Sequence, residues 1–230
     1  MTTLLAIETS TETASIALLS QGRVICRELS GVQTHSQGVL PAIQEILKEA
    51  GIALKQCDAI AFGCGPGAFT GVRTACGIVQ GLAFGADLPI LPIVSLHAMA
   101  ESARGAQSEA DMLCVLDARM GEVYWAHYRY QRQAWSQVTG PTLSTVEQVL
   151  VYMKSNEVAL VLGHGLAGHF ASDKSVNKMP HAEQVARLAA IDFSMARQVD
   201  AAQAQPLYLR NKIALTTAER AQLTTNLTPN

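Results

Sequence analysis

The stretch AIAFGCGPGAFTGVRTACGIVQGLAFG, from Ala59 to Gly85, decides the fold. It opens with a short apolar run, Ala59 to Phe62, which has the length typical of a buried strand. Glycine and proline dominate positions 63 to 67 and predict a sharp turn. Thr70 is the expected N-cap of the next segment, which is apolar and free of proline. That segment predicts a helix ending near Gly85.

Three glycines in the expected helix form a stripe. Gly77, Gly81 and Gly85 recur every four residues and therefore share one helix face. Each interior glycine costs about 1 kcal/mol relative to alanine, so the stripe requires something that packs very close to it. Two interpretations stay open, namely close packing on the protein's own sheet or close packing on a helix of a partner.

The composition indicates a globular protein. Hydrophobic residues make up 49% and charged residues 16% of the 230 residues, a length that allows one large domain or two small ones. The net charge is −2 and no run of Lys or Arg occurs, which argues against strong nucleic-acid binding by this chain alone. The five cysteines form no C-x-x-C pair and indicate reduced thiols in a cytoplasmic protein. We expect neither a signal peptide nor a membrane span.

The chain before residue 59 predicts three strands and one helix. Leu4–Ile7, Ala14–Leu18 and Arg23–Leu29 are joined by short turns and predict an antiparallel meander. A Rossmann unit needs a helical crossover between its first two strands, so the G-x-G-x-x-A match at Gly63–Ala68 is a weak dinucleotide signal. Apolar residues at spacings of three and four predict a helix over Ser36–Ala50.

The rest of the chain predicts a second round of strands. Small and charged residues gather between Glu101 and Asp111, so we expect two subdomains, 1–103 and 104–230. The expected elements are a strand at Leu88–Val94, a helix capped by Ser95 to about Ser102, strands at Met112–Leu116 and Glu122–Tyr130, a helix opened by a Ser144–Glu147 capping box, a strand at Val158–Leu162 and a helix at His181–Ala196. The tail after about residue 214 is expected to be loosely ordered.

The sequence contains no convincing catalytic constellation. Only His97 has a plausible chelating neighbour, Glu101, and a zinc site needs three or four ligands, so we expect no metal. Glu8 and Asp117 end expected strands, where carboxylates serve catalysis or simply form turn hydrogen bonds. A glycine turn before a helix can hold an anion. Weak nucleotide or anion binding therefore stays open for Glu8, Thr9, Ser10, Gly65 and Gly67.

Five stretches match one known pattern: AIETS at 6–10, His35-Ser36 before Leu40-Pro41, GPGAFTGVR at 65–73, DARMGEVY at 117–124 and QPLYLR at 205–210. Together they closely resemble the TsaB (YeaZ) family of bacterial tRNA threonylcarbamoyladenosine (t6A) synthesis, over positions 4 to 210. The resemblance implies an α/β, actin-like ATPase fold of the ribonuclease H-like kind. Each of its two subdomains would hold a mixed sheet that starts as a strand meander.

The resemblance also implies a scaffold role without catalysis. In this scheme TsaC makes threonylcarbamoyl-adenylate, and TsaD transfers the threonylcarbamoyl group to adenosine 37 of tRNAs that read codons starting with A. The family supports TsaD, while TsaE is an ATPase that engages the pair. TsaD-like proteins carry a metal-binding H-x-x-x-H, whose second histidine is replaced here by Glu101. The alternative is a stand-alone actin-like ATPase or kinase that binds a nucleotide between its subdomains.

The resemblance and the glycine stripe predict a docking surface on the helices at 36–50 and 70–85. It would bind TsaD and would form a homodimer in the isolated protein, with tRNA contacted only through the complex and no membrane involved. The expected partner-binding residues are Val39, Leu40, Ile43, Leu47, Arg73, Gly77, Gln80 and Gly81.

Overall fold

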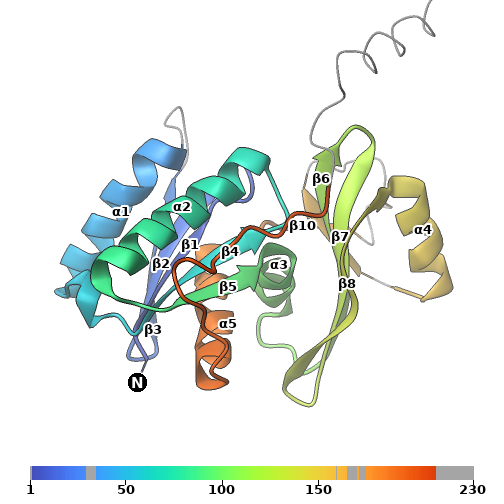
Figure 1. The fold of residues 1–230 in the computed structure, drawn as a ribbon. Coiled ribbons are helices and arrows are strands. Elements are labelled where there is room, and N and C mark those ends of the chain that lie inside the picture. The colour runs from blue at the N-terminus through green and yellow to red at the C-terminus, as the bar shows by residue number, and fades with distance from the viewer. Residues whose placement is uncertain (1, 30–34, 159, 165–169, 171–174, 211–230) are drawn as a thin grey trace, which may run out of the picture.

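The chain forms two five-stranded mixed sheets that lie side by side (Figure 1). The computed structural model describes residues 2–29, 35–158, 160–164, 170 and 175–210. The strand order is β3-β2-β1-β4-β5 in the first sheet and β10-β9-β6-β7-β8 in the second. In each sheet an antiparallel meander continues into parallel strands. The predicted repetition of one plan in both halves is confirmed.

The first sheet places its most apolar strands at the centre. Its strands are β1 (Leu4–Glu8), β2 (Ala14–Ser20), β3 (Arg23–Leu29), β4 (Ala59–Gly65) and β5 (Ile90–Val94). Every residue of β1 and β4 is buried because helices cover both faces of the sheet. The edge strand β3 is half-exposed, and it carries the most charge.

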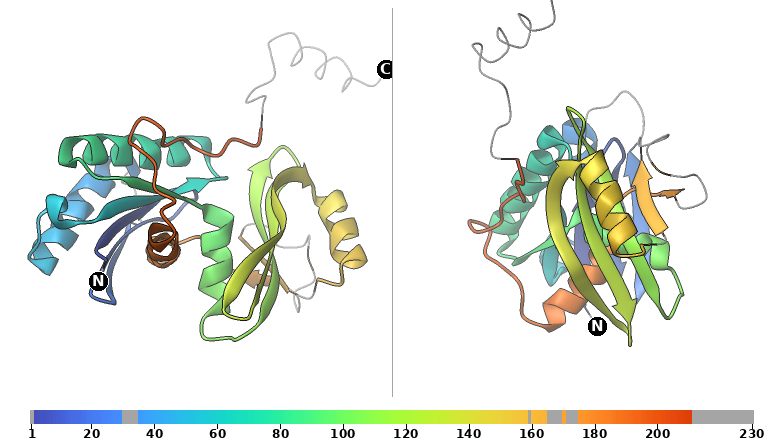
Figure 2. Two further views of the ribbon diagram at one scale, coloured as in Figure 1. Left: turned by 60° about the horizontal axis from the view of Figure 1, so that its bottom comes forward. Right: turned by 90° about the vertical axis from the view of Figure 1, so that its right-hand side faces the viewer.

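Helices α1 (His35–Ala50) and α2 (Phe69–Ala86) cover one face of the first sheet. The short 3-10 helix η1 (Leu54–Gln56) follows α1, which ends at Gly51 in a left-handed conformation, as predicted. Helix α5 (Ala182–Ser194) covers the opposite face, as the left view of Figure 2 shows. The expected division at residue 103/104 is therefore corrected, because α5 comes after the second sheet in the sequence and packs on the first.

The second sheet contains β6 (Ala110–Arg119), β7 (Glu122–Gln131), β8 (Ala134–Thr145), β9 (Leu160–His164) and β10 (Ser175–Asn177). Helix α3 (Ser95–Arg104) lies between the two sheets and buries apolar side chains against β6 and β7. Helix α4 (Val146–Ser155) packs on the outer face of the second sheet. Among the described helices, none is both long and apolar enough to cross a membrane.

Three predicted helix starts are wrong by one or two residues. The N-cap of α2 is Ala68, so Thr70 lies inside the first turn. The N-cap of α3 is Val94, because the Ser95 hydroxyl is buried and bonds to Glu8 instead. The capping box of α4 joins Thr145 and Gln148 rather than Ser144 and Glu147. Strand β8 was not predicted, and the expected tail after residue 214 lies outside the described residues.

Candidate functional site

The loop after β1 packs directly on the glycine turn between β4 and α2. A Cβ atom at Gly67 or Gly71 would lie no more than 3.0 Å from backbone atoms of Ser10 or Thr9, so only glycine allows this approach. The Ala68 N–H donates to the Ser10 carbonyl at 2.7 Å, and the Thr9 hydroxyl donates to the Gly71 carbonyl at 2.8 Å. The two loops therefore form one rigid unit at the end of the sheet.

Glu8 stabilises this unit by hydrogen bonds from inside the fold. Its fully buried carboxylate accepts hydrogen bonds from the Ser10 N–H at 2.6 Å and from the Ser95 hydroxyl at 2.8 Å. Burial raises the pKa of this carboxyl above its ordinary value. The side chains of Glu8 and Thr9 are buried and hold the two loops together. The expectation that they contact a nucleotide is therefore corrected.

A cleft of about 370 Å³ opens between the two sheets, next to this unit. Ser10 and Gly67 line it, whereas Gly65 lies beneath Val72 and the Leu207 carbonyl. The Ser10 hydroxyl oxygen is buried and has no hydrogen-bond partner among the described residues. The lining residues are 10–12, 67–69, 72, 116–120, 124, 179 and 207–210.

The charges around the cleft are already paired. Arg119 forms an ion pair with Asp117 at 3.1 Å, and Arg210 forms one with Glu122 at 2.7 Å. Both arginines of the lining therefore have carboxylate partners, which reduces the attraction that the cleft offers to a phosphate. The lining also offers the Ser10 hydroxyl and the backbone at Gly67 as polar groups.

Residues 204–210 cross from α2 to the second sheet along the mouth of the cleft. The Leu207 N–H donates to the Cys64 carbonyl at 2.7 Å, and Arg73 Nε donates to the Tyr208 hydroxyl at 2.6 Å. The guanidinium carbon of Arg73 also lies 3.6 Å from the centre of the Phe69 ring, a cation–π contact. Arg73, an expected partner-binding residue, is thus held in place by this segment.

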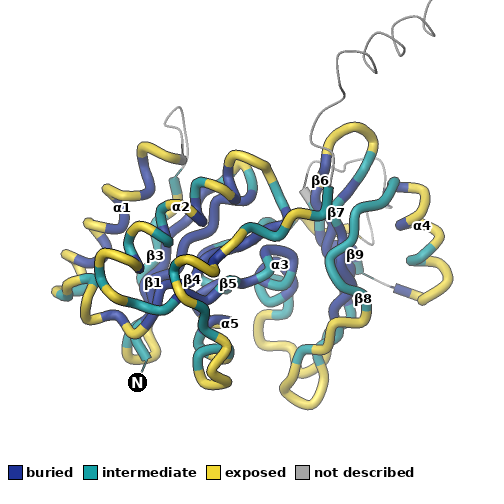
Figure 3. The backbone as a smooth tube through the Cα atoms, in the orientation of Figure 1, coloured by how far each residue is buried: buried dark blue, intermediate teal, exposed yellow. Residues whose placement is uncertain are grey.

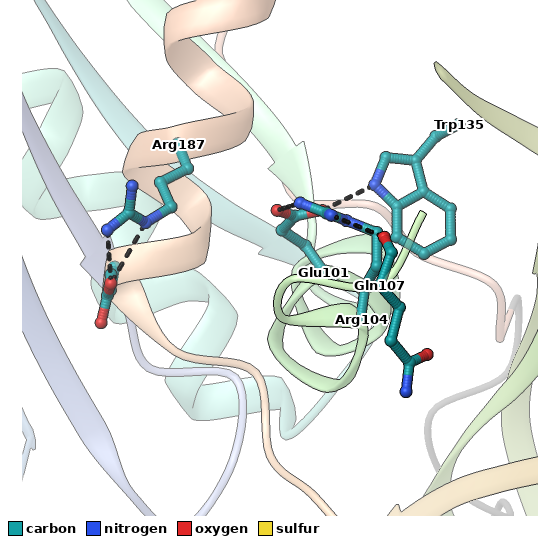
Figure 4. A network of polar contacts seen from close by, with 6 residues as sticks. Glu101, Arg104, Gln107, Trp135 and Arg187 are labelled. Carbon is teal, nitrogen blue, oxygen red and sulfur yellow. Dashed lines mark hydrogen bonds and ion pairs between the residues drawn. The ribbon is translucent and has the colours of Figure 1, made fainter. Parts of the chain in front are cut away.

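The position of the TsaD-like metal pair does not fit a metal ion. The His97 ring stacks on Tyr128 and meets Trp135 edge-on, and desolvation lowers its pKa to about 4. Glu101 accepts hydrogen bonds from Arg104 at 2.7 Å and from the Trp135 indole N–H at 2.7 Å (Figure 4). Within the described part of the chain, no third ligand joins His97 and Glu101. Together they form an internal link between α3 and β8.

The outer face of α2 carries the glycine stripe. Apart from the backbone of α2 itself, no described atom lies within 4 Å of a Cβ atom built at Gly77, Gly81 or Gly85, so packing on the protein's own sheet is excluded as the reason for the stripe. Phe84 on the same helix is 86% exposed, and Figure 3 shows the exposed outer side of α2 in yellow.

The expected surface anchors on α1 need a correction. Val39, Ile43 and Leu47 are buried in the first sheet's own core, because they form the apolar stripe by which α1 packs. Leu40 points away from that core and is 44% exposed. Gln80 is half-buried and donates to the Ala204 carbonyl at 2.9 Å. The accessible part of the expected surface is therefore Leu40, Arg73, Gly77 and Gly81.

The structure brings together a group that the sequence did not indicate. Cys26, His181 and Glu183 offer potential metal-ligand atoms that all lie within 4.8 Å of one another. The expectation of no metal considered only His97 and Glu101 and did not include this group. Cys26 is far in the chain from His181 and Glu183, and the packing of the start of α5 on the first sheet brings it next to them. The close spacing of His181 and Glu183 and the alternation of Cys26 with Glu28 on one strand face were the local signals.

Comparison with known proteins gives the class first. Two mixed sheets with this repeated order, flanked by helices, have the actin-like ATPase fold. The family model described as TsaD, tRNA N6-adenosine threonylcarbamoyltransferase, matches residues 22–223. The chain belongs to this family, in the branch of the TsaB (YeaZ) proteins.

Three relatives support this assignment. The tRNA threonylcarbamoyladenosine biosynthesis protein TsaB of Haemophilus influenzae is 37% identical over 92% of this chain and 94% of its own length. The protein of the same name from Escherichia coli K12 is 35% identical over 92% of this chain and 96% of its own length. The solved structure of YeaZ from Pseudomonas aeruginosa superposes with a TM-score of 0.81 and 38% identity, covering 91% of this chain and all of that chain.

Proposed function

We propose that this chain is a non-catalytic scaffold of tRNA t6A synthesis, which binds TsaD and supports its transfer of threonylcarbamoyl to adenosine 37. TsaE and TsaC would take part in the same cytoplasmic pathway. Two facts support the scaffold role. The relatives carry the name of a t6A biosynthesis protein, and His97 and Glu101 are engaged in internal contacts.

The open glycine stripe of α2 carries the docking part of the proposal. Three glycines without neighbours let a second helix approach the α2 backbone closely, and Phe84 offers an exposed apolar side chain on the same helix. Leu40 on α1 and the fixed guanidinium of Arg73 extend the surface. The isolated protein would form a homodimer through the same surface, in competition with TsaD.

Gly81→Leu tests the docking surface. Because a Cβ atom at this exposed position meets nothing beyond the backbone of α2 itself, the variant should fold with a nearly unchanged melting temperature. Its leucine should keep a partner helix away and weaken TsaD binding by more than about tenfold, which corresponds to about 1.4 kcal/mol. Titration calorimetry with TsaD gives the affinity, and Lys154→Leu on the exposed side of α4 is the matched control.

Native TsaD affinity in a normally folded Gly81→Leu variant would exclude the stripe as the interface. The scaffold role itself has a separate test. Modification of tRNA by purified TsaC, TsaD and TsaE should depend on addition of this chain. Equal modification without the chain would contradict the scaffold role and leave the docking result unaffected.

The second candidate function is nucleotide binding in the cleft. The observation that favours it is the unpartnered Ser10 hydroxyl beside the glycine turn. The paired arginines count against it. Calorimetric titration of the isolated protein with Mg-ATP decides between the two functions. The scaffold function predicts no more than weak heat of binding. It also predicts that Ser10→Ala leaves the titration unchanged.

A further inference from the structure

Three chemically suitable side chains meet at the edge of the first sheet. Cys26 lies on the edge strand β3, His181 is the N-cap of α5, and Glu183 lies in the first turn of that helix. All three are half-buried, and their potential ligand atoms lie within 4.8 Å of one another. The cluster lies outside the cleft and outside the outer face of α2, so it is independent of the function proposed above.

The backbone holds the three side chains on rigid elements. Cys26 pairs with Ala17 in the β2–β3 ladder. Ser15, on the same strand as Ala17, accepts a buried hydrogen bond from the Ala182 N–H at 2.9 Å, which fixes the start of α5 against the sheet. A site built on a strand and an anchored helix start holds its ligands in a defined geometry.

The hydrogen bonds of His181 indicate which ring nitrogen carries the proton and which carries the lone pair. Nδ1 accepts the Glu183 N–H at 3.1 Å, and Nε2 lies 3.2 Å from Glu28 Oε1. In the neutral ring the proton therefore lies on Nε2, facing the carboxylate, and the lone pair lies on Nδ1, where it accepts the Glu183 N–H. An ion bound at Nδ1 must displace this hydrogen bond. A histidine that donates its second ring N–H to a carboxylate is the usual arrangement of a metal ligand. Glu28 is thus a positioning residue for the ring.

The surrounding charges also suit a divalent ion. Arg187 donates two hydrogen bonds to Glu183 Oε1, at 3.1 and 2.9 Å (Arg187 is labelled in Figure 4). Within the described part of the chain, no residue donates a hydrogen bond to Glu183 Oε2. A thiolate and the carboxylates of Glu28 and Glu183 would balance a divalent ion together with Arg187. Burial raises the pKa of the free Cys26 thiol to about 11, so ion binding must displace its proton.

We propose that Cys26, His181 and Glu183 bind one divalent ion of the zinc class, with a water completing the coordination. Sulfur, nitrogen and oxygen ligands in one set suit Zn²⁺ better than Mg²⁺ or Ca²⁺, which prefer oxygen alone. The ion clips the start of α5 to β3, two elements joined by no backbone ladder. It therefore ties the helix that follows the second sheet to the edge of the first.

The test is equilibrium dialysis of the metal-free full chain against Zn²⁺, followed by metal analysis. The parent should bind one zinc per chain. Cys26→Ser, Glu183→Gln and His181→Asn should each lose affinity by more than about tenfold, since loss of even an orienting outer partner costs about 10–100-fold. Asparagine is chosen at 181 because it keeps the N-cap of α5. Cys76→Ser and His97→Phe are the controls and should bind zinc like the parent.

Two further measurements guard against misfolded variants. Added Zn²⁺ should raise the melting temperature of the parent and of both controls, and leave that of the three ligand variants unchanged. Co²⁺ in place of Zn²⁺ should give the parent a thiolate-to-cobalt absorption band. Failure of the parent to bind zinc, absence of the cobalt band, or equal zinc affinity in the ligand variants would overturn the proposal. Loss of zinc only in His97→Phe would place the ion elsewhere and also overturn it.

Discussion

The carboxylate of Glu8 fills the space that a side chain at Gly63 would need. A Cβ atom built at Gly63 would lie less than 3.0 Å from all three terminal atoms of the Glu8 carboxylate. The carboxylate cannot move aside without loss of its bonds to Ser10 and Ser95. The two residues come from adjacent strands of the sheet, so the glycine on β4 and the acid on β1 form one unit.

Gly63→Ala should therefore destabilise the protein by about 1–3 kcal/mol, the usual cost of overpacking. Gly77→Ala is the matched control, because no described atom lies near its new methyl group. There the change should stabilise the isolated chain by up to about 1 kcal/mol through helix propensity. Urea unfolding of both variants measures the difference, and equal stabilities would contradict this account.

Glu8 should also give the stability a dependence on pH. Burial raises its folded-state pKa above the ordinary 4.5, so the native state holds this proton more tightly than the unfolded chain. The stability that comes from the protonated carboxyl is complete below pH 4.5 and is lost as the pH rises through the raised pKa. Glu8→Gln removes this loss. From pH 4.5 upward, urea midpoints should fall in the parent relative to the variant, and parallel curves would refute the assignment.

His97 should act in the opposite direction. Its folded-state pKa is lowered to about 4 from the ordinary 6.5, mainly by desolvation, so the unfolded chain binds this proton more tightly. Stability is therefore lost as the pH falls from 6.5 towards 4. His97→Phe keeps a ring between Tyr128 and Trp135 and removes the proton. The variant should lose less stability in this window, and an unchanged acid profile would show that His97 titrates normally.

The isolated chain should bind tRNA only weakly. Its net charge is −2, and phosphate contacts from Lys and Arg supply most of the affinity for nucleic acids. Arg119 and Arg210 are also paired with carboxylates. A gel shift at physiological salt measures this. Tight binding by this chain alone would contradict the proposal that tRNA is contacted through the complex.

The sequence predicted the parts of the fold that depend on local pattern. The apolar run Ala59–Phe62, the glycine turn and the meander are short-range signals, and the structure confirms all three. Strand β8 was missed because Gly140 and Pro141 interrupt a mostly polar segment, whose pairing with β7 supplies the order. Ser95 was read as a cap because its buried bond to Glu8 depends on a contact between distant residues.

The candidate site could be predicted only in part, for the same physical reason. Ser10 and Gly67 were expected near a ligand and do line the cleft, since both lie in loops at one end of the sheet. Arg119 and Arg210 also line the cleft, but this could not be predicted, because it depends on how the second sheet packs beside the first. The pattern that predicts an apolar helix face cannot tell which neighbour it meets. Val39 and Ile43 were therefore assigned to a partner, although they pack in the protein's own core.

The position of α5 has a consequence for the order of events on the ribosome. One face of the first sheet is covered by residues 182–194, which are synthesised after every strand of the second sheet. The nascent chain therefore presents Leu4, Ala61 and Leu91 on an uncovered apolar face while the second sheet is being made. Such surfaces promote aggregation of folding intermediates. The first sheet can become fully native only after residue 194 has been made.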